Sequence, residues 1–254
     1  MAHRIRIRFS KHSHMIFIGH LDLMRYFQKA IRRSGIDISY TAGFSPHQVM
    51  SFAQPLGVGV YSQGEYMDIS METMPGTQNI MDALNGVMVE GVDILDVIEL
   101  PEDAVNSMAS VAAAEYSVYF REDHVPDFDI GQGFEAFMAQ EHINIIKETK
   151  KGSREVDLKE HIYRYGIFPG TQDPEGKNSI TVSGIDKGCG CINMLLDASS
   201  GGNIKPGLVM EEFYRYMGRE MGKFDIIVKR EDMFADKGDE KEHIWQSLSK
   251  AGTR

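Results

Sequence analysis

Two histidines and one carboxylate near the start of the chain are the residues best suited to chemistry. His20 and Asp22 lie in the segment His20-Leu-Asp-Leu-Met-Arg25, and His47 ends the segment Gly43-Phe-Ser-Pro-His47. A His-x-Asp pair with a distant histidine can supply three ligands to zinc or iron. Histidine also titrates near neutral pH, so His20 and His47, with Asp22, could act as an acid–base pair on a phosphodiester or small anion. A structural role is the alternative, because a carboxylate in the first turn of a helix favours the helix dipole.

The segment that carries His20 and Asp22 has the periodicity of an amphipathic helix. Leu21, Met24, Phe27 and Ile31 recur at helical spacing, and Gly35 is a typical C-terminal stop. The opposite face carries Arg25, Lys29, Arg32 and Arg33. The strand after this helix should return towards the helix start, so we predict one ligand-binding cluster at that end of the first domain. Its members are His20, Asp22, Arg25, Arg32, Phe44 and His47.

A second basic group lies in Arg4-Ile-Arg-Ile-Arg-Phe9, which alternates polar and apolar residues like a half-buried strand. Arg4, Arg6 and Arg8 then share one face, and the alternation of residues 65–71 places Tyr66 on the same face. We predict that this face is open, because arginines beside an exposed aromatic ring suit single-stranded RNA. The alternative is that Asp68 and carboxylates from the acidic second half pair with these arginines.

The charge of the chain is uneven. The net charge is −10, yet residues 1–50 carry eight Lys or Arg against two Asp. This argues against non-specific nucleic-acid binding and leaves room for one anionic partner at one place.

The sequence also bears on location and cofactors. No apolar run reaches the roughly 20 residues that a membrane helix needs, and the N-terminus lacks the apolar core of a signal peptide. Cys189 and Cys191 are separated by one residue, which favours reduced thiols in a cytoplasmic protein and is too little for an iron–sulfur cluster. We therefore predict a cytoplasmic protein without a membrane segment, a metal ion or a cofactor of its own.

The order of predicted elements in residues 1–100 is β-α-β-β-α-β, the ferredoxin-like plan. The same order of elements, with extra strands inserted, follows in residues 113–230. Residues 101–112 form a linker between the two, and residues 231–254 form a polar tail. We therefore predict an α+β protein with two ferredoxin-like domains in tandem, the second elaborated with extra strands.

Several motifs together resemble the radical-SAM-linked protein family, a domain of unknown function found beside or fused to a radical SAM protein. The resemblance is dense over residues 4–100 and weaker later. It rests on Phe17-Ile-Gly-His-Leu-Asp-Leu-Met-Arg25, Ala30-Ile-Arg-Arg33, Gly43-Phe-Ser-Pro-His47, Ser51-Phe-Ala53, Pro55-Leu-Gly-Val58, Gly64-Glu-Tyr66, Arg154-Glu-Val-Asp157 and Lys205-Pro206. It implies a radical SAM protein as partner.

These observations give three functional hypotheses. The leading one is an accessory protein without independent catalytic activity, which presents RNA or an RNA-containing particle to a radical SAM enzyme. The second is the acid–base enzyme described above, with His20, His47 and Asp22 as its catalytic residues. The third is a protein adaptor that binds no ligand of its own.

Overall fold

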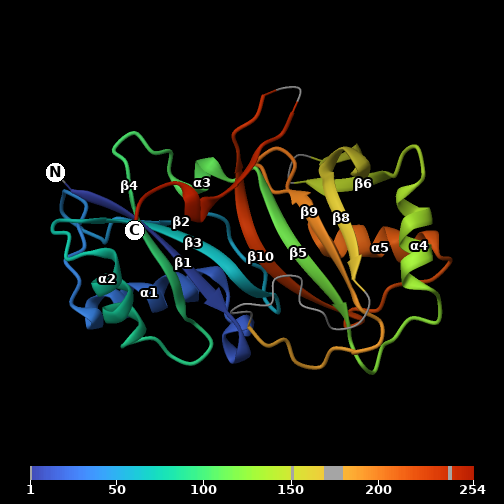
Figure 1. Ribbon diagram of the computed structural model, residues 1–254, viewed down its shortest axis with the longest axis horizontal. Helices are drawn as coiled ribbons and strands as arrows, with labels where there is room; N and C mark the ends of the chain where they lie inside the picture. Colours follow the sequence, from blue (N-terminus) through green and yellow to red (C-terminus); the bar gives the residue numbers. More distant parts are fainter. Residues whose placement is uncertain (1, 150–151, 169–179, 240–241) are drawn as a thin grey trace. The chain divides into compact units, whose positions relative to one another are not determined.

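The computed structural model describes residues 2–149, 152–168, 180–239 and 242–254. Contacts divide the chain into two compact units, one of residues 1–112 and 230–254 and one of residues 113–229. Both units combine helices with mostly antiparallel strands, which confirms the predicted α+β class (Figure 1). Among the described residues, no helix has the length and apolar character that a membrane span needs.

The first unit follows the element order expected for residues 1–100. Its strands pair in the order β4-β1-β3-β2, and each of these pairs is antiparallel. Between them lie two longer helices and a 3-10 turn. The elements are β1 (His3–Lys11), η1 (Ser13–Phe17), α1 (His20–Ser34), β2 (Met50–Phe52), β3 (Tyr61–Met71), α2 (Thr77–Asn85), β4 (Ile94–Leu100) and the short α3 (Ser107–Ser110).

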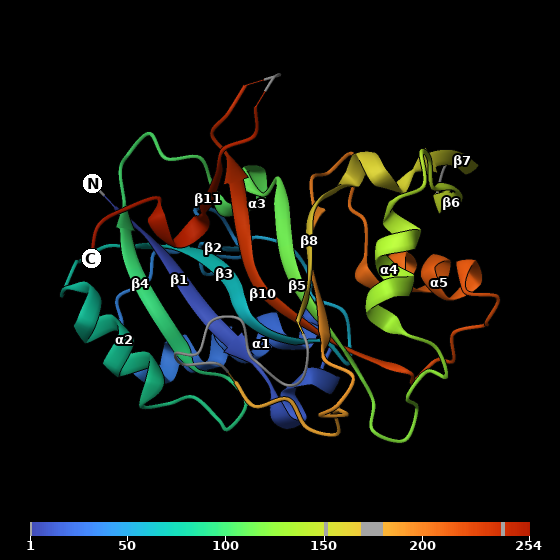
Figure 2. The same ribbon diagram turned by 45° about the vertical axis from the view of Figure 1, so that its right-hand side comes forward.

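The core of the first unit lies between these strands and the two longer helices. Figures 1 and 2 show α1 and α2 on one side of β4, β1 and β3. Ile5, Ile7 and Phe9 of β1 are fully buried, as their alternation predicts, and pack with Leu23 and Phe27 of α1. α1 ends at Gly35, whose φ of 74° is the left-handed conformation that a helix stop requires.

Residues 231–254 differ from the predicted polar tail. They contain most of β10 (Ile226–Asp236), β11 (Trp245–Ser247) and η3 (Leu248–Lys250), and they belong to the first unit. β10 neighbours β3, and β11 pairs with β10. The physical reason is that polar residues of this segment are paired rather than solvated: Glu231 Oε2 accepts a hydrogen bond from Gln63 Nε2 at 2.7 Å, with both side chains buried.

The predicted linker also differs from the structure. Residues 101–112 belong to the first unit, and they include α3. Asn106 caps α3, since its side chain accepts a hydrogen bond from the Ala109 N–H, and the Ser107 N–H donates to Asp68 Oδ2 at 2.7 Å. The contact of Ser107 with Asp68 of β3, and that of the Val105 carbonyl with Arg6 of β1, hold the segment against these two strands.

The second unit has the strand order β5-β9-β8, and both pairs are antiparallel. The extra strands predicted for this half include the separate hairpin of β6 and β7. Its core gathers aromatic rings of two helices, with Phe134 and Phe213 centroids 5.1 Å apart. The elements are β5 (Ala113–Phe120), α4 (Ile130–Met138), β6 (Asn144–Thr149), β7 (Gly152–Asp157), η2 (Leu158–His161), β8 (Ile162–Phe168), β9 (Cys191–Asp197) and α5 (Pro206–Tyr216).

Candidate functional site

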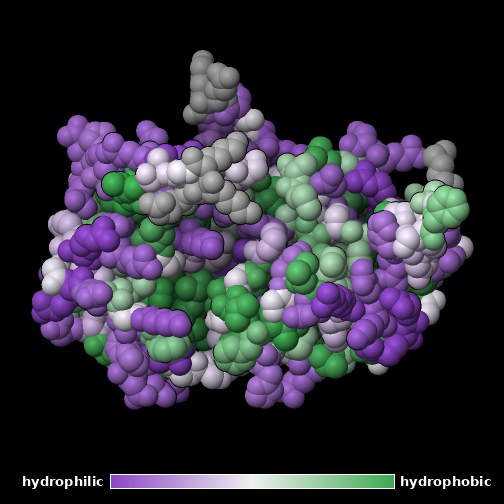
Figure 3. All heavy atoms as spheres, turned by 180° about the vertical axis from the view of Figure 1, so that it is seen from behind, coloured by the Kyte–Doolittle hydropathy of each residue, from purple (hydrophilic) through white to green (hydrophobic). Residues whose placement is uncertain are grey.

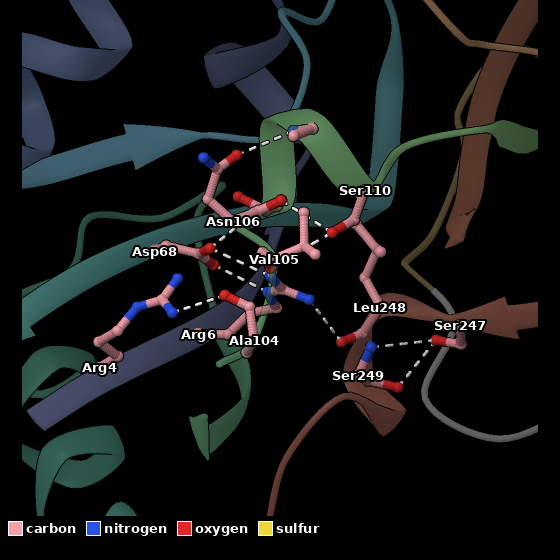
Figure 4. Close-up of polar contacts among 12 residues, drawn as sticks. Arg4, Arg6, Asp68, Ala104, Val105, Asn106, Ser110, Ser247, Leu248 and Ser249 are labelled. Carbon is pink, nitrogen blue, oxygen red and sulfur yellow. Dashed lines mark hydrogen bonds and ion pairs between the residues drawn. The ribbon is translucent and has the colours of Figure 1, made fainter. Parts of the chain in front are cut away.

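Arg6, the middle arginine of β1, is a structural residue with 1% of its surface exposed. Its Nε and Nη2 donate to the two carboxylate oxygens of Asp68 at 2.8 and 3.1 Å. Nη2 also donates to the Val105 carbonyl at 3.1 Å and Nη1 to the Leu248 carbonyl at 3.3 Å (Figure 4). Four of the five guanidinium donors therefore tie β1 to β3, to the segment before α3 and to η3.

The flanking arginines are also engaged by backbone carbonyls. Arg4 Nη1 donates to the carbonyls of Glu102 and Ala104 at 3.2 and 2.6 Å. Arg8 Nε donates to the Gln63 carbonyl at 3.0 Å, and its Nη2 to the Glu231 carbonyl at 3.2 Å. We call Arg4, Arg6 and Arg8 the arginine ladder. Its hydrogen bonds fasten residues 102–105, and residues 231 and 248 near the end of the sequence, to β1.

Tyr66 completes the same layer and is 1% exposed. Its hydroxyl donates to Asp232 and lies 3.3 Å from the Ser247 hydroxyl. Burial first, and then the Asp232 carboxylate, raise the pKa of this phenol well above its usual range. The prediction of an open RNA-binding face made of Arg4, Arg6, Arg8 and Tyr66 is therefore wrong, because residues 102–105, 231–232 and 247–248 cover it. The alternative pairing of Asp68 is what the structure has.

A cavity of about 240 Å³ remains beside Arg6 in the first unit. It is smaller than the roughly 300–1,000 Å³ of typical ligand pockets. The side chains around it are mixed, and the hydroxyls of Ser110 and Ser247 already have partners. Its lining comprises Arg6, Pro101, Asp103, Ala104, Val105, Ser110, Ala235, Lys237, Gln246, Ser247, Leu248 and Ala251.

The predicted ligand-binding cluster begins at the first turn of α1. The half-buried His20 ring packs edge-on against Phe52, with centroids 5.3 Å apart. Asp22 and Arg25 lie one turn apart with a contact of 3.4 Å, and both side chains are about two-thirds exposed. This contact is a weak surface pair, so the Arg25 guanidinium remains accessible to solvent.

The second part of the cluster lies further along α1. Arg32 Nε and Gln48 Nε2 both donate to the Gln28 carbonyl, each at 3.3 Å. His47 is exposed and is held by its neighbour Thr41, whose hydroxyl accepts from the His47 N–H at 3.1 Å. Phe44, at the tip of the same loop, is fully exposed.

These contacts correct the prediction of a single cluster at the helix start. The chain after α1 passes Gln28 at Gln48 and reaches His20 only at Phe52. Eight residues of helix separate Gln28 from His20, about 12 Å at 1.5 Å per residue. His20, Asp22 and Arg25 therefore lie at one end, and Arg32 and the loop of Phe44 and His47 lie further along. No hydrogen bond in the described residues joins His20 to His47, so the acid–base pair gains no support.

What the structure does show is a stripe of exposed cations on α1 and an exposed aromatic ring, Phe44, on the loop whose Gln48 donates to the Gln28 carbonyl of that helix. Arg25, Lys29 and Arg32 are all exposed at positions i, i+4 and i+7, so they line one face of the helix. We call these three residues the basic face of α1. Hydrophilic residues cover most of the surface drawn in Figure 3, with smaller hydrophobic patches between them. Among the exposed large hydrophobic residues of the described part of the chain, Phe44 is the most exposed.

The cysteines of the second unit do not form a reactive site. Neither cysteine is part of a disulfide; Cys191 is buried and Cys189 half-buried. Burial, and then the hydrogen bond and charge of Asp186, raise the pKa of Cys189 to about 11. Within the described ranges, no group of three His, Cys, Asp or Glu is arranged to hold a metal ion.

Sequence reasoning missed a charged cluster in the second unit, where Lys147 and Arg154 converge on the turn before α5. The available signal was the cross-strand pairing that the hairpin implies, which makes Lys147 and Arg154 direct partners. It also missed the buried Lys11, whose ammonium donates to the carbonyls of Ile16 and Ile18 at 3.3 and 2.9 Å. No local pattern distinguishes such a lysine from a solvated one.

Comparisons with known proteins place the chain in a family but assign no activity. No curated protein matches it. A chain of a solved structure entitled "Crystal Structure of a Cbf5-Nop10-Gar1 Complex" has 10% identity and a TM-score of 0.43, over 90% of this chain and 48% of that chain. This chain thus spans about half the length of that protein. A family model described as "Uncharacterized protein conserved in bacteria (DUF2344)" matches residues 4–206, which cover most of both units. The chain belongs to this DUF2344 family.

Proposed function

We propose that this protein is a cytoplasmic accessory protein, without catalytic activity of its own, that presents RNA to a radical SAM enzyme. The observation that carries the RNA part is the basic face of α1 beside the exposed Phe44. Cations that track phosphates, next to a ring on which a base can stack, are what single-stranded RNA requires.

The geometry of this surface favours a flexible strand over a compact ligand. Arg25 and Arg32 are seven residues apart, about 10 Å along the helix axis. That length suits successive phosphates of an extended chain. Phe44 stands on the loop that Gln48 holds to the Gln28 carbonyl, next to the attachment point of Arg32. A base stacked on Phe44 would therefore lie at the Arg32 end of the basic face.

The radical SAM partner rests on the resemblance of residues 17–25, 30–33, 43–47, 51–53, 55–58 and 64–66 to the radical-SAM-linked protein family. These residues include parts of α1, the Phe44 loop, part of β2 and part of β3. The residues that carry the resemblance and the residues of the proposed RNA surface therefore largely coincide. Tandem ferredoxin-like domains are part of the proposal; the element order of the first unit and the strand order β5-β9-β8 of the second support them.

The test is a crosslinking experiment on the full-length protein together with a radical SAM protein. Ultraviolet crosslinking, followed by mass spectrometry of peptides that carry a nucleotide, should find the modified residue at Phe44 or in α1. Phe44→Leu should remove most of the crosslink while keeping an apolar residue at the tip of the loop. Tyr216→Leu removes another exposed ring, on α5, and serves as the matched control. Crosslinks confined to the second unit, or absent from the complex, would overturn the proposal.

A further inference from the structure

The second unit holds a concentration of positive charge that the proposed function does not use. Lys147 of β6 and Arg154 of β7 are direct cross-strand partners, so their side chains lie on the same face of the hairpin. Lys205, the exposed residue just before α5, lies close enough to Lys147 to contribute to the lowering of its pKa. These three cations come from three different segments and meet at one place.

The meeting place is the turn Gly201–Asn203. Lys147 Nζ donates to the carbonyls of Gly202 and Asn203, the latter at 3.1 Å. Arg154 Nη2 donates to the Gly201 carbonyl at 2.9 Å. In the described part of the chain these are the hydrogen bonds of the two cationic groups. One of three ammonium donors and several of the five guanidinium donors are therefore left for a ligand.

The charge at this turn is not balanced. Burial and the neighbouring Arg154 and Lys205 lower the pKa of Lys147, and Asp197 is the carboxylate that opposes them. Asp197 is itself engaged, because its oxygens accept from His161 Nδ1 and the Ser199 N–H, each at 2.8 Å. Three cations thus stand against one carboxylate that already has partners. Like charges held together in this way favour the arrival of an anion.

There is also room for a ligand. A Cβ added at Gly201 or at Gly207, in the first turn of α5, would meet nothing within 4 Å. At Gly202 the opposite holds, since a Cβ there would collide with the Asp197 carboxylate. Gly202 is therefore needed for the packing of the turn, while Gly201 and Gly207 border open space.

We infer that Lys147, Arg154 and Lys205 form a phosphate-binding site over the turn Gly201–Asn203, separate from the basic face of α1. The occupant is a phosphate group with at least two free oxygens. Arg154 would bind it through its unused guanidinium donors, and Lys147 and Lys205 would neutralise its charge. The N-terminal end of α5 adds favourable dipole. The phosphate has two possible sources, a free phosphate compound or the backbone of a nucleic acid.

The test is a titration of the full-length, ¹⁵N-labelled protein with inorganic phosphate against potassium chloride of equal ionic strength. Phosphate should shift the amide signals of Gly201, Gly202 and Gly207 in a saturable manner. Lys205→Gln is the cleanest variant, because its ammonium makes no hydrogen bond in the described structure; it should weaken binding about tenfold, the scale of one charged hydrogen bond. Arg154→Gln should weaken it at least as much. Lys187→Gln, an exposed lysine of the same unit, is the charge-matched control and should bind normally.

A parallel titration with tetrauridylate identifies the source of the phosphate. Saturation of the same glycine signals at lower concentration than with inorganic phosphate supports a nucleic-acid backbone, and preference for inorganic phosphate supports a free compound. Absence of saturable shifts with both probes, or equal loss in Lys187→Gln and Lys205→Gln, overturns the inference. Loss of RNA binding through Arg25 or Phe44 leaves these signals unchanged, so the two proposals fail separately.

Discussion

At the scale of single residues, a buried arginine of β1 is paired with a buried carboxylate of β3. Arg6 and Asp68 are direct partners in the β1–β3 register, and two hydrogen bonds join their side chains. The alternation of residues 4–9 was sufficient to place Arg6 on the face away from α1. It was not sufficient to show that this face is covered, because the covering residues lie about 100 and 240 positions away in sequence.

Replacing Arg6 by Met should destabilise the protein by about 3–5 kcal/mol, because it leaves the Asp68 carboxylate buried without its partner. Adding Asp68→Leu should recover part of that loss, since an apolar pair of similar volume avoids the desolvation cost. Arg254→Met removes an ion pair with Asp96 whose arginine is 71% exposed, and it should cost about 1 kcal/mol or less. Urea unfolding of the four proteins measures these differences. A loss below about 1 kcal/mol in Arg6→Met alone would contradict the structural role.

Cys189 offers a second test at the residue scale. Its pKa of about 11 leaves almost no thiolate at neutral pH, and the thiolate is the reactive form. Iodoacetamide should therefore modify Cys189 slowly at pH 7.5, with the rate rising up to about pH 11. Asp186→Asn should move this rise to lower pH, because Asp186 adds to the effect of burial. Mass spectrometry at timed intervals gives the rates, and rapid labelling at pH 7.5 would show that the assigned environment is incorrect.

At the scale of elements, periodic patterns gave the helices and the longer strands of the first unit. The cations opposite the buried face of α1 are exposed, as predicted, and Gly35 ends the helix. The predicted place of the Phe44 loop is wrong because the position of the loop depends on non-local hydrogen bonds, from Gln48 to the Gln28 carbonyl and from the Ser70 N–H to the Val49 carbonyl. The direction of the strand correctly predicts that the chain returns towards the start of α1. It does not predict how far along α1 the loop lies.

The hairpin of β6 and β7 depends on the Asp157 carboxylate at its end. Burial alone would raise the pKa of Asp157, but the N–H groups of Ile143 and Lys159 and the His142 ring outweigh it, so the pKa is lowered. A depressed carboxylate stabilises the folded state above its unfolded pKa of about 3.9, and this contribution is lost as pH falls through the folded pKa. Asp157→Ala should therefore cost about 2 kcal/mol at pH 7.

The difference between Asp157→Ala and the unmodified protein should shrink below about pH 4. Unfolding free energies from pH 7 to 2 measure it. Glu155→Ala, at an exposed position of the same strand, controls for the loss of one negative charge. A difference for Asp157→Ala that stays constant over the whole range would mean that the ionised carboxylate is not the stabilising group.

At the scale of the whole molecule, the sequence predicted two passes of strands and helices but not where the chain ends. The last 24 residues complete the first unit, although their composition is polar. Their burial depends on specific partners, such as Asp232 for Tyr66, and no periodic apolar signal announces it. Because this segment and residues 102–105 cover the arginine ladder, we propose that RNA binds to the basic face of α1 and not to the sheet.

The measurement that tests this account most directly is the affinity of the full-length protein for a fluorescein-labelled single-stranded RNA, by anisotropy over a range of salt concentrations. The triple variant Arg25→Gln, Lys29→Gln, Arg32→Gln should bind far more weakly, and the plot of log affinity against log salt should lose about two units of slope. Phe44→Ala should cost about 1–3 kcal/mol with the slope unchanged, because stacking is not electrostatic. The control is a triple variant at the exposed Lys187, Lys223 and Lys250, each changed to Gln, which removes the same charge elsewhere. Equal losses in both triple variants, or unaltered binding in the α1 variant, would contradict the claim that the basic face of α1 binds RNA.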